Sequence, residues 1–260
     1  MRIAAIQLSV SDAQTVEQRR LSADDSFERI ASDERKADMI LLPEIWGCGF
    51  FDFDNYMESA ESLDGPTFQM LSRRAKELNA WILGGSIVES DGDRLYNTSL
   101  LIDRHGELVG TYRKMHLFGY QSREQEILTR GDETAVFDTE FGKIGLSTCY
   151  DLRFPEQYRA MIDKGSEIFL VVSAWPEARL EHWRLFNQMR AVENQSWLVS
   201  CNCAGTQKGS LYAGHSMAVS PTGEIVAEAG RDPCIQWSEI DVSAVKTARE
   251  RFPALADRIV

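Results

Sequence analysis

The sequence has few basic residues for its length and no long apolar run, and these two shortages exclude two classes of protein. Its 28 Lys and Arg residues are outnumbered by 40 Asp and Glu residues, which gives a formal net charge of -12. No Lys/Arg cluster is present that could neutralise a phosphate backbone. No stretch approaches the ~18 consecutive apolar residues that a membrane span requires. We therefore expect neither nucleic acid nor a membrane as a partner.

A secretory signal and a disulfide framework are also missing. The segment 1–10 is a short apolar run followed at once by Ser11 and Asp12, so it lacks the length and the cleavage site of a signal peptide. The five cysteines are an odd number in a chain too large to need disulfides, which favours reduced thiols. We therefore expect a cytoplasmic protein in which a thiol is available for chemistry.

Hydrophobic periodicity predicts alternating strands and helices. No repeat, low-complexity segment or linker divides the chain, so one domain over residues 1–260 is expected. The alternation predicts an α/β fold of stacked sheets covered by helices. Strands are predicted at 2–8, 39–42, 80–88, 96–103, 142–149, 167–173 and 197–203, helices at 16–36, 66–79, 153–164 and 181–195, hairpins within 96–112 and 214–229, and a packed tail at 245–260.

Cys149 is the first candidate for chemistry. It ends a predicted strand, and a helix is predicted to begin within a few residues. A helix N-terminus there would favour the thiolate through its dipole, and its free N–H groups could bind an oxyanion. Free cysteines are more often small buried apolar residues. The position of Cys149 alone does not decide between these interpretations.

Two charged residues also stand at the ends of strands. Glu44 lies directly after a buried-looking strand and before Trp46, a costly place for a carboxylate without a partner. It is a candidate base, or else an exposed carboxylate at a strand end. Lys114 lies at the end of the second strand of the predicted hairpin, where an ordinary surface lysine is the simpler interpretation.

Together these fragments resemble the nitrilase, or carbon-nitrogen hydrolase, superfamily. The segments Pro43-Glu44, Lys114-Met115-His116-Leu117 and Cys149-Tyr150-Asp151 stand in that family's order and at its usual separations. The resemblance continues through Ala191-Val192-Glu193-Asn194-Gln195 and Gly214-His215-Ser216. It implies a four-layer α-β-β-α sandwich and a Glu-Lys-Cys triad.

The resemblance also implies a mechanism without metal or organic cofactor. Glu44 takes the thiol proton, Cys149 attacks the amide carbon, and Lys114 with the Tyr150 N–H stabilises the oxyanion. Ammonia leaves, and Glu44 then activates the water that hydrolyses the thioester. Many members carry a second glutamate in the loop after the lysine, for which the spacing favours Glu124 over Glu126, with a role in holding Lys114 and the substrate amide.

Several neighbouring residues complete the predicted site. Trp175 and Arg179 follow a strand that ends on the same side as Cys149, so an aromatic wall and a cation suited to a small carboxylated amide are expected there. Each could instead pack a loop or lie on the surface. The pair Cys201-x-Cys203 has no matching histidine spacing for a metal, and His116 is expected to hold its loop.

The resemblance extends to one branch of the superfamily. The residues around Cys149, with the Trp-Pro, Arg, His-Trp and Glu-Asn-Gln pattern, are similar to bacterial omega-amidases acting on linear amides, 2-oxoglutaramate or 2-oxosuccinamate. Deaminated glutathione amidase is the nearest alternative. A non-catalytic binding or scaffold member is the alternative of another class, and the filled triad positions disfavour it. A homodimer or larger homo-oligomer is implied by the resemblance alone, while the physiological amide, the oligomer size and the pathway stay open.

Overall fold

Two six-stranded sheets form the centre of the protein. The computed structural model describes residues 1–259, so Val260, the last residue of the predicted tail, lies outside the described residues. The first sheet consists, in spatial order, of β14 (Cys234–Glu239), β1 (Arg2–Gln7), β2 (Met39–Leu41), β3 (Trp81–Asp91), β4 (Arg94–Ile102) and β5 (Leu108–Arg113). The second consists of β13 (Ile225–Glu228), β12 (Met217–Val219), β9 (Trp197–Asn202), β8 (Ile168–Ser173), β7 (Gly142–Thr148) and β6 (Ala135–Thr139).

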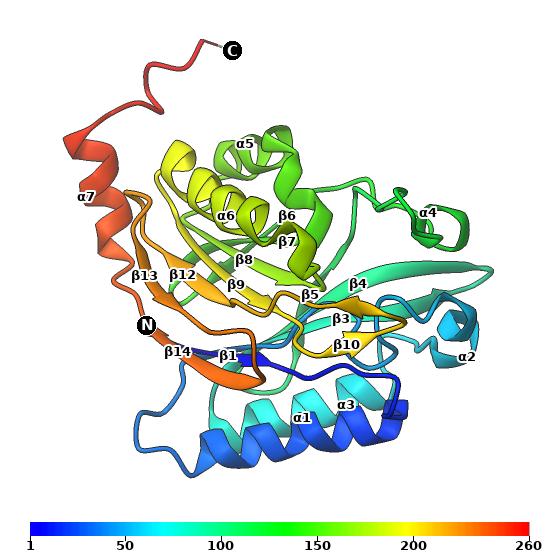
Figure 1. Cartoon of the computed structure of the whole chain (residues 1–260). Coiled ribbons are helices and arrows are strands. Elements are labelled where there is room, and N and C mark those ends of the chain that lie inside the picture. The colour runs from blue at the N-terminus through cyan, green and yellow to red at the C-terminus, as the bar shows by residue number, and fades with distance from the viewer. Residues whose placement is uncertain (260) are drawn as a thin grey trace.

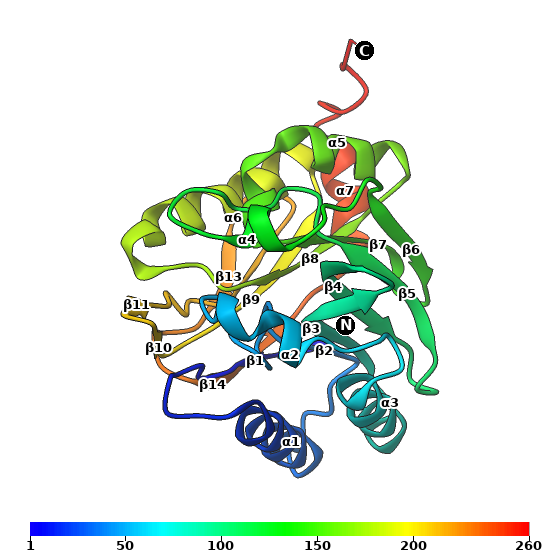
Figure 2. The same ribbon diagram turned by 90° about the vertical axis from the view of Figure 1, so that its right-hand side faces the viewer.

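Helices cover both outer faces of the pair of sheets. The helices are α1 (Val16–Ala31), α2 (Tyr56–Ser59), α3 (Pro66–Leu78), α4 (Glu124–Ile127), α5 (Pro155–Asp163), α6 (Leu180–Asn194) and α7 (Ser243–Arg251), and a hairpin of β10 (Thr206–Gln207) and β11 (Ser210–Leu211) projects beside them. Helices α1 and α3 lie on the first sheet, while α5 and α6 lie on the second (Figures 1 and 2). This is the four-layer arrangement that the resemblance predicted, and it is confirmed.

The layers are held together by apolar side chains that alternate along the strands. Ile3 and Leu41 of the first sheet meet Ile144 and Leu170 of the second in a core between the sheets, and all four are at most 1% exposed. The intervening residues of the first sheet pack against α1 and α3, and those of the second against α5 and α6. Each sheet is therefore buried on both faces, which explains the nearly continuous apolar runs in its strands.

Local sequence signals set the helix boundaries. Helix α1 begins after Thr15, whose hydroxyl accepts from the N–H of Gln18. Helix α3 begins with Pro66 at its first position and ends at Asn79, which adopts a left-handed conformation with φ of +49°. Both helices were predicted, although α1 ends five residues before the expected boundary.

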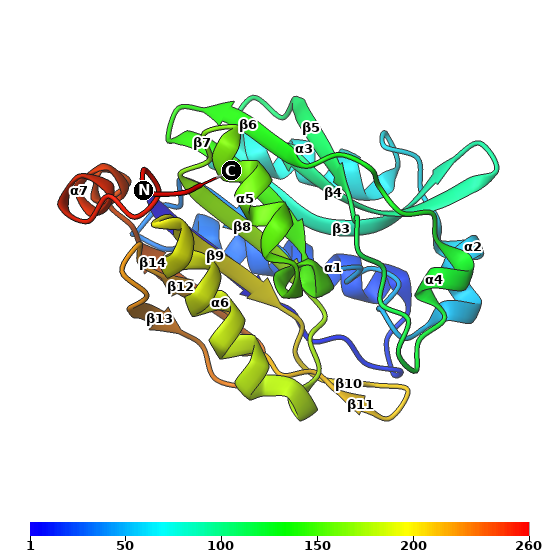
Figure 3. The same cartoon turned by 90° about the horizontal axis from the view of Figure 1, so that it is seen from above.

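Parallel strands in each sheet bring chain segments to a common edge. Strands β1, β2 and β3 are mutually parallel, as are β7, β8 and β9. Their carboxyl ends therefore deliver Glu44 after β2, Cys149 after β7 and Trp175 after β8 to neighbouring positions. Seen from above, this edge is bordered by α4 and the β10–β11 hairpin (Figure 3).

The structure corrects three predicted elements. Strand β14 was missed; it pairs antiparallel with β1 from the far end of the chain. The helix predicted from Arg153 begins at Pro155, because a 3₁₀ turn over Cys149–Arg153 comes first. The tail predicted from residue 245 is wrong in its first part, since α7 packs there and the Gln195 amide donates to its end. In the described part of the chain, no helix combines the length and apolarity needed to cross a membrane.

Candidate active site

Three charged side chains meet in the interior between the two sheets. The Lys114 ammonium lies 2.8 Å from Glu44 Oε1 and 2.9 Å from Glu124 Oε1, and all three side chains are fully buried. Burial lowers the pKa of Lys114, but the charges of Glu124 and Glu44 outweigh this and raise it above its usual value. Burial, together with the charge of Glu44, raises the pKa of Glu124, and Lys114 opposes that rise. The lysine is therefore charged, as an electrostatic stabiliser must be.

Neutral donors complete the coordination of the two carboxylates. The Asn97 amide on β4 donates to Glu44 Oε1 at 2.8 Å and to Glu124 Oε1 at 3.0 Å. The Ala174 N–H donates to Glu44 Oε2 at 2.9 Å, and the Phe118 N–H donates to Glu124 Oε2 at 2.6 Å. A buried carboxylate needs such donors, and they fix the direction in which each oxygen points.

The structure separates the two candidates for the second glutamate. Glu124, the first residue of α4, belongs to the buried cluster. Glu126 is exposed and pairs with Arg123 on the surface. The helical turn of α4 places these two side chains on different sides. Only Glu124 can therefore contact Lys114.

Cys149 lies at a sharp turn between β7 and the 3₁₀ turn that follows. Its φ is +48°, and Ile45, directly after Glu44, has a φ of +40°. Non-glycine residues in this region are uncommon, and for a β-branched residue the conformation is costly. Strained backbone therefore occurs at both Cys149 and the residue beside Glu44, which is typical of functional sites.

The predicted effect of a helix N-terminus on Cys149 is wrong. Helix α5 begins only at Pro155, so its N-terminus is not at the thiol. Burial instead raises the pKa of Cys149 well above that of an ordinary thiol, the Glu44 carboxylate raises it further, and Lys114 opposes the rise. The resting thiol is therefore protonated, and a neighbouring base is needed to remove its proton.

A second buried carboxylate, Asp151, connects the turn at Cys149 to the strand that carries Lys114. Asp151 accepts hydrogen bonds from the Tyr112 hydroxyl at 2.6 Å, the His116 N–H at 3.1 Å and the Thr148 N–H at 2.9 Å. Tyr112 and His116 lie two residues on either side of Lys114. The expectation that His116 holds its loop is confirmed, since its ring also contacts Asp151 at 2.8 Å.

A cavity of about 590 Å³ opens over Cys149. Tyr150, Trp175 and Arg179 line it, as the sequence predicted for the substrate-binding residues. Trp183 does not; it is fully buried and packs behind Trp175, with ring centroids 5.6 Å apart. Phe50, Phe51 and Phe118 add further aromatic surface on the remaining sides.

Arg153 is a cavity residue to which the sequence assigned no role. Its guanidinium carbon lies 5.1 Å from the Trp175 ring and 5.0 Å from the Phe186 ring. Burial lowers its pKa, and the nearby Arg179 lowers it further. Within residues 1–259, neither Arg153 nor Arg179 forms an ion pair with a carboxylate. The cavity therefore presents two guanidinium groups without acidic partners.

The remaining thiols and acids form no metal site in the described residues, where no group of three or more potential ligands is found. Cys201 and Cys203 are both fully buried and free. Cys203 lies against the carbonyl of Glu44, with its sulfur 3.6 Å from that oxygen. These two thiols pack the interior behind the cluster.

Comparison with known proteins decides the family. A family model described as carbon-nitrogen hydrolase matches residues 2–250. The chain belongs to the carbon-nitrogen hydrolase family. The predicted membership of this superfamily and its omega-amidase-like branch is thereby confirmed, since similar relatives carry amidase names.

Three relatives are similar to the hydrolase over nearly its whole length. A 2-oxoglutaramate amidase of Paenarthrobacter nicotinovorans is 35% identical over 98% of this chain and 88% of the relative. The crystal structure of Saccharomyces cerevisiae Nit3, a member of branch 10 of the nitrilase superfamily, has a TM-score of 0.88 and 31% identity, over 97% of this chain and 94% of Nit3. A mutant of the amidase from Nesterenkonia sp. AN1, with an acetamide moiety on its active-site cysteine, has a TM-score of 0.85 and 26% identity, over 99% of this chain and 93% of that one.

Two residues of the site, Asn97 and Arg153, were missed for different reasons. Asn97 begins a polar run, Asn97-Thr98-Ser99, inside a strand that is buried on both faces. Such a run is costly without partners and is the signal that could have identified it. Arg153 was quoted in the motif around Cys149, but nothing local indicates that its side chain enters the cavity.

Proposed function

We propose that this hydrolase is an omega-amidase that releases ammonia from a small linear amide with a carboxylated tail, 2-oxoglutaramate or 2-oxosuccinamate. The observation that carries the proposal is the pair of guanidinium groups, Arg153 and Arg179, in the Cys149 cavity. Guanidinium groups bind carboxylates through paired, charge-assisted hydrogen bonds. The names of the relatives, 2-oxoglutaramate amidase and omega-amidase, support the same substrate class.

The first half of the proposed reaction forms a thioester on Cys149. Glu44 accepts the proton of the thiol, which its raised pKa keeps protonated at rest. The sulfur attacks the amide carbon, and the electrons of the carbonyl bond move to its oxygen. Lys114 has three N–H donors, of which Glu44 and Glu124 occupy two, so one remains for the oxyanion together with the Tyr150 N–H.

The second half hydrolyses the thioester. Collapse of the tetrahedral intermediate breaks the carbon–nitrogen bond, and the protonated Glu44 gives its proton to the departing nitrogen, so that ammonia leaves. Glu44 then takes a proton from water, whose oxygen attacks the thioester carbon. The carbon–sulfur bond breaks, the acid product forms, and the proton returns from Glu44 to the Cys149 sulfur. Glu124 is proposed to hold Lys114 in place throughout.

Ammonia release tests the proposal. The purified protein is assayed with 2-oxoglutaramate, deaminated glutathione and a simple nitrile, beside Cys149→Ala. We expect release from 2-oxoglutaramate that falls at least ~10⁴-fold in Cys149→Ala, as when other cysteine or serine nucleophiles are removed. The variant is expected to keep its circular dichroism spectrum and melting temperature. Full activity in Cys149→Ala, or activity on deaminated glutathione alone, would contradict the proposal.

We further propose that the protein is a cytoplasmic homodimer that associates through α6. Leu185, Met189 and Val192 are 61%, 50% and 40% exposed and follow one side of that helix. A stripe of this kind on a two-fold axis can pack against itself in a second copy. The five cysteines are all free, as expected for the cytoplasm. Light scattering of Met189→Glu is expected to give a monomer, whereas wild-type mass in this variant would contradict association through α6.

A further inference from the structure

One side of the Cys149 cavity is formed by two separate segments of chain. Phe50 and Phe51 come from the loop that follows Glu44, and Gly209 to Leu211 come from the β10–β11 hairpin. The Lys114 ammonium lies 5.2 Å from the centroid of the Phe50 ring, so this side reaches the charged cluster. The positions of the two segments relative to each other therefore decide what fits over Cys149.

A single buried amide joins the two segments. Gln207 is fully buried, and its Oε1 accepts from the Phe51 N–H at 3.1 Å and from the Tyr212 hydroxyl at 2.8 Å. Its Nε2 donates to the Cys48 carbonyl at 3.4 Å. The Gln207 side chain thus bonds the main chain on both sides of Gly49 and Phe50.

The fit around this amide is tight. Gly49 has a φ of +88°, and a Cβ built there would lie 2.1 Å from Gln207 Nε2, so a larger residue has no room. The Phe51 ring stacks on the Tyr212 ring, with centroids 5.5 Å apart. Arg19, on α1, donates to the same Cys48 carbonyl at 2.6 Å and fixes the loop from its other side. Small displacements of Gln207 are therefore transmitted to Phe51.

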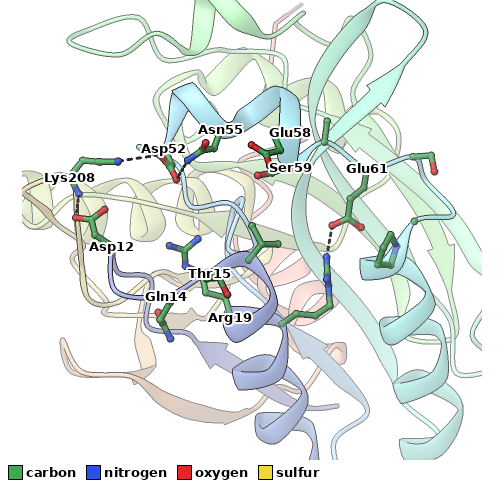
Figure 4. A pocket seen from close by; sticks show the side chains of 16 residues that line it. Asp12, Gln14, Thr15, Arg19, Asp52, Asn55, Glu58, Ser59, Glu61 and Lys208 are labelled. Atoms are coloured by element: carbon green, nitrogen blue, oxygen red, sulfur yellow. Dashed lines mark hydrogen bonds and ion pairs between the residues drawn. The ribbon is translucent and has the colours of Figure 1, made fainter.

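The outer face of the hairpin has a different attachment. Lys208, the next residue, faces a surface groove of about 890 Å³ that is lined by the starts of α1 and α3 and by the segment 52–62 (Figure 4). Its ammonium lies 3.3 Å from Asp52, and its N–H donates to Asp12 at 2.8 Å. Lys208 is half exposed, so this outer attachment is weak compared with the buried amide.

We propose that Gln207 is a positioning residue that sets substrate specificity, because its amide holds Phe50 and Phe51 at a fixed distance from the β10–β11 hairpin. Gln207 does not touch the reacting atoms. Its loss leaves the Glu44–Lys114–Cys149 geometry in place but lets the aromatic side of the cavity move. The inference rests on the proposed omega-amidase function for the choice of substrates.

The test compares two amides in three variants. Gln207→Leu removes every hydrogen bond at nearly the same volume, Tyr212→Phe removes one of them, and Lys208→Met removes only the outer ion pair. In Gln207→Leu we expect the ratio of kcat/KM for 2-oxoglutaramate to that for propionamide to fall about tenfold, mainly through KM. Tyr212→Phe is expected to lower it about threefold, and Lys208→Met to leave it unchanged.

Alkylation of Cys149 separates specificity from lost folding and from a wrong substrate class. The fraction of protein whose Cys149 reacts with iodoacetamide gives the intact fraction, to which each kcat is normalised. The rate of N-ethylmaleimide relative to iodoacetamide reports the shape of the cavity without turnover, and we expect it to change at least threefold in Gln207→Leu. If that variant does not fold, Tyr212→Phe decides by the same measurements.

Failure of the wild type on 2-oxoglutaramate would contradict only the proposed function, because the alkylation ratio still tests Gln207. Unchanged substrate and alkylation ratios in a folded Gln207→Leu, or in Tyr212→Phe, would overturn the role of Gln207. An equal loss of kcat on both amides with an unchanged alkylation ratio would assign it a structural role only.

Discussion

The Cys149 cavity and the surface groove beside α1 are both rich in charge, but they differ in how the charges are paired. In the groove, Arg20 bonds Glu17 at 2.8 Å and Glu61 at 3.1 Å, and Lys208 bonds Asp52 (Figure 4). In the cavity, Arg153 and Arg179 have no carboxylate partner among the described residues. The groove is larger, at about 890 Å³ against about 590 Å³. Unpaired charge beside a nucleophile therefore indicates the functional hollow better than volume does.

The largest expected effect separates the two lysines of these regions. Lys114→Met removes the proposed oxyanion donor, which typically costs ~10²–10³-fold in kcat. It also leaves Glu44 and Glu124 buried without a cation, at a cost of about 3–5 kcal/mol in the free energy of unfolding. Lys208→Met, in the groove, is expected to change neither. Ammonia release and urea unfolding measure both, and equal behaviour of the two variants would break the comparison.

The arginines sharpen the comparison further. Arg153→Gln is expected to raise KM for 2-oxoglutaramate about 10–150-fold, since a hydrogen bond to a charged group contributes about 1.5–3 kcal/mol. Its KM for propionamide, which has no carboxylate, should stay the same. Arg20→Gln, the control in the groove, is expected to leave both KM values unchanged. An equal rise for both amides in Arg153→Gln would show that Arg153 does not bind the carboxylate.

The smallest effect concerns the thiols. Because burial and Glu44 raise the pKa of Cys149, its thiolate fraction should keep increasing about tenfold per pH unit beyond pH ~8.5, where an ordinary thiol levels off. Burial likewise raises the pKa of Cys48, to about 11, without a carboxylate cluster beside it. Mass spectrometry of iodoacetamide-treated protein follows each cysteine separately. A plateau for Cys149 below pH ~8 would show that Lys114 dominates over burial and Glu44.

Much of the fold could be predicted from the sequence, because its strands are buried on both faces and its main helices have clear start signals. Pro66 and Thr15 mark helix starts that the structure confirms. Strand β14 escaped prediction because its residues are mostly half-buried and its partner β1 lies over 200 residues away. The extent of the domain, residues 1–260, stays a prediction.

The site shows the same division between local and distant signals. Glu44, Lys114, Cys149 and Glu124 were found by motif, and the structure brings the three charged residues into one cluster. Gln207 and Asn97 were not found, because each acts through contacts made only when segments distant in sequence meet. The direction of the Cys149 pKa was also missed, because a carboxylate from another sheet and the depth of burial determine it.

The division of the site between the two sheets has a consequence for how activity arises. Glu44 follows a strand of the first sheet and Cys149 a strand of the second, and the apolar side chains between the sheets hold these residues together. Either half of the chain alone would lack part of the site. During refolding, turnover should therefore return only after the two halves associate, later than the circular dichroism signal of the strands. Two complementary fragments, each inactive, would regain catalysis only on recombination.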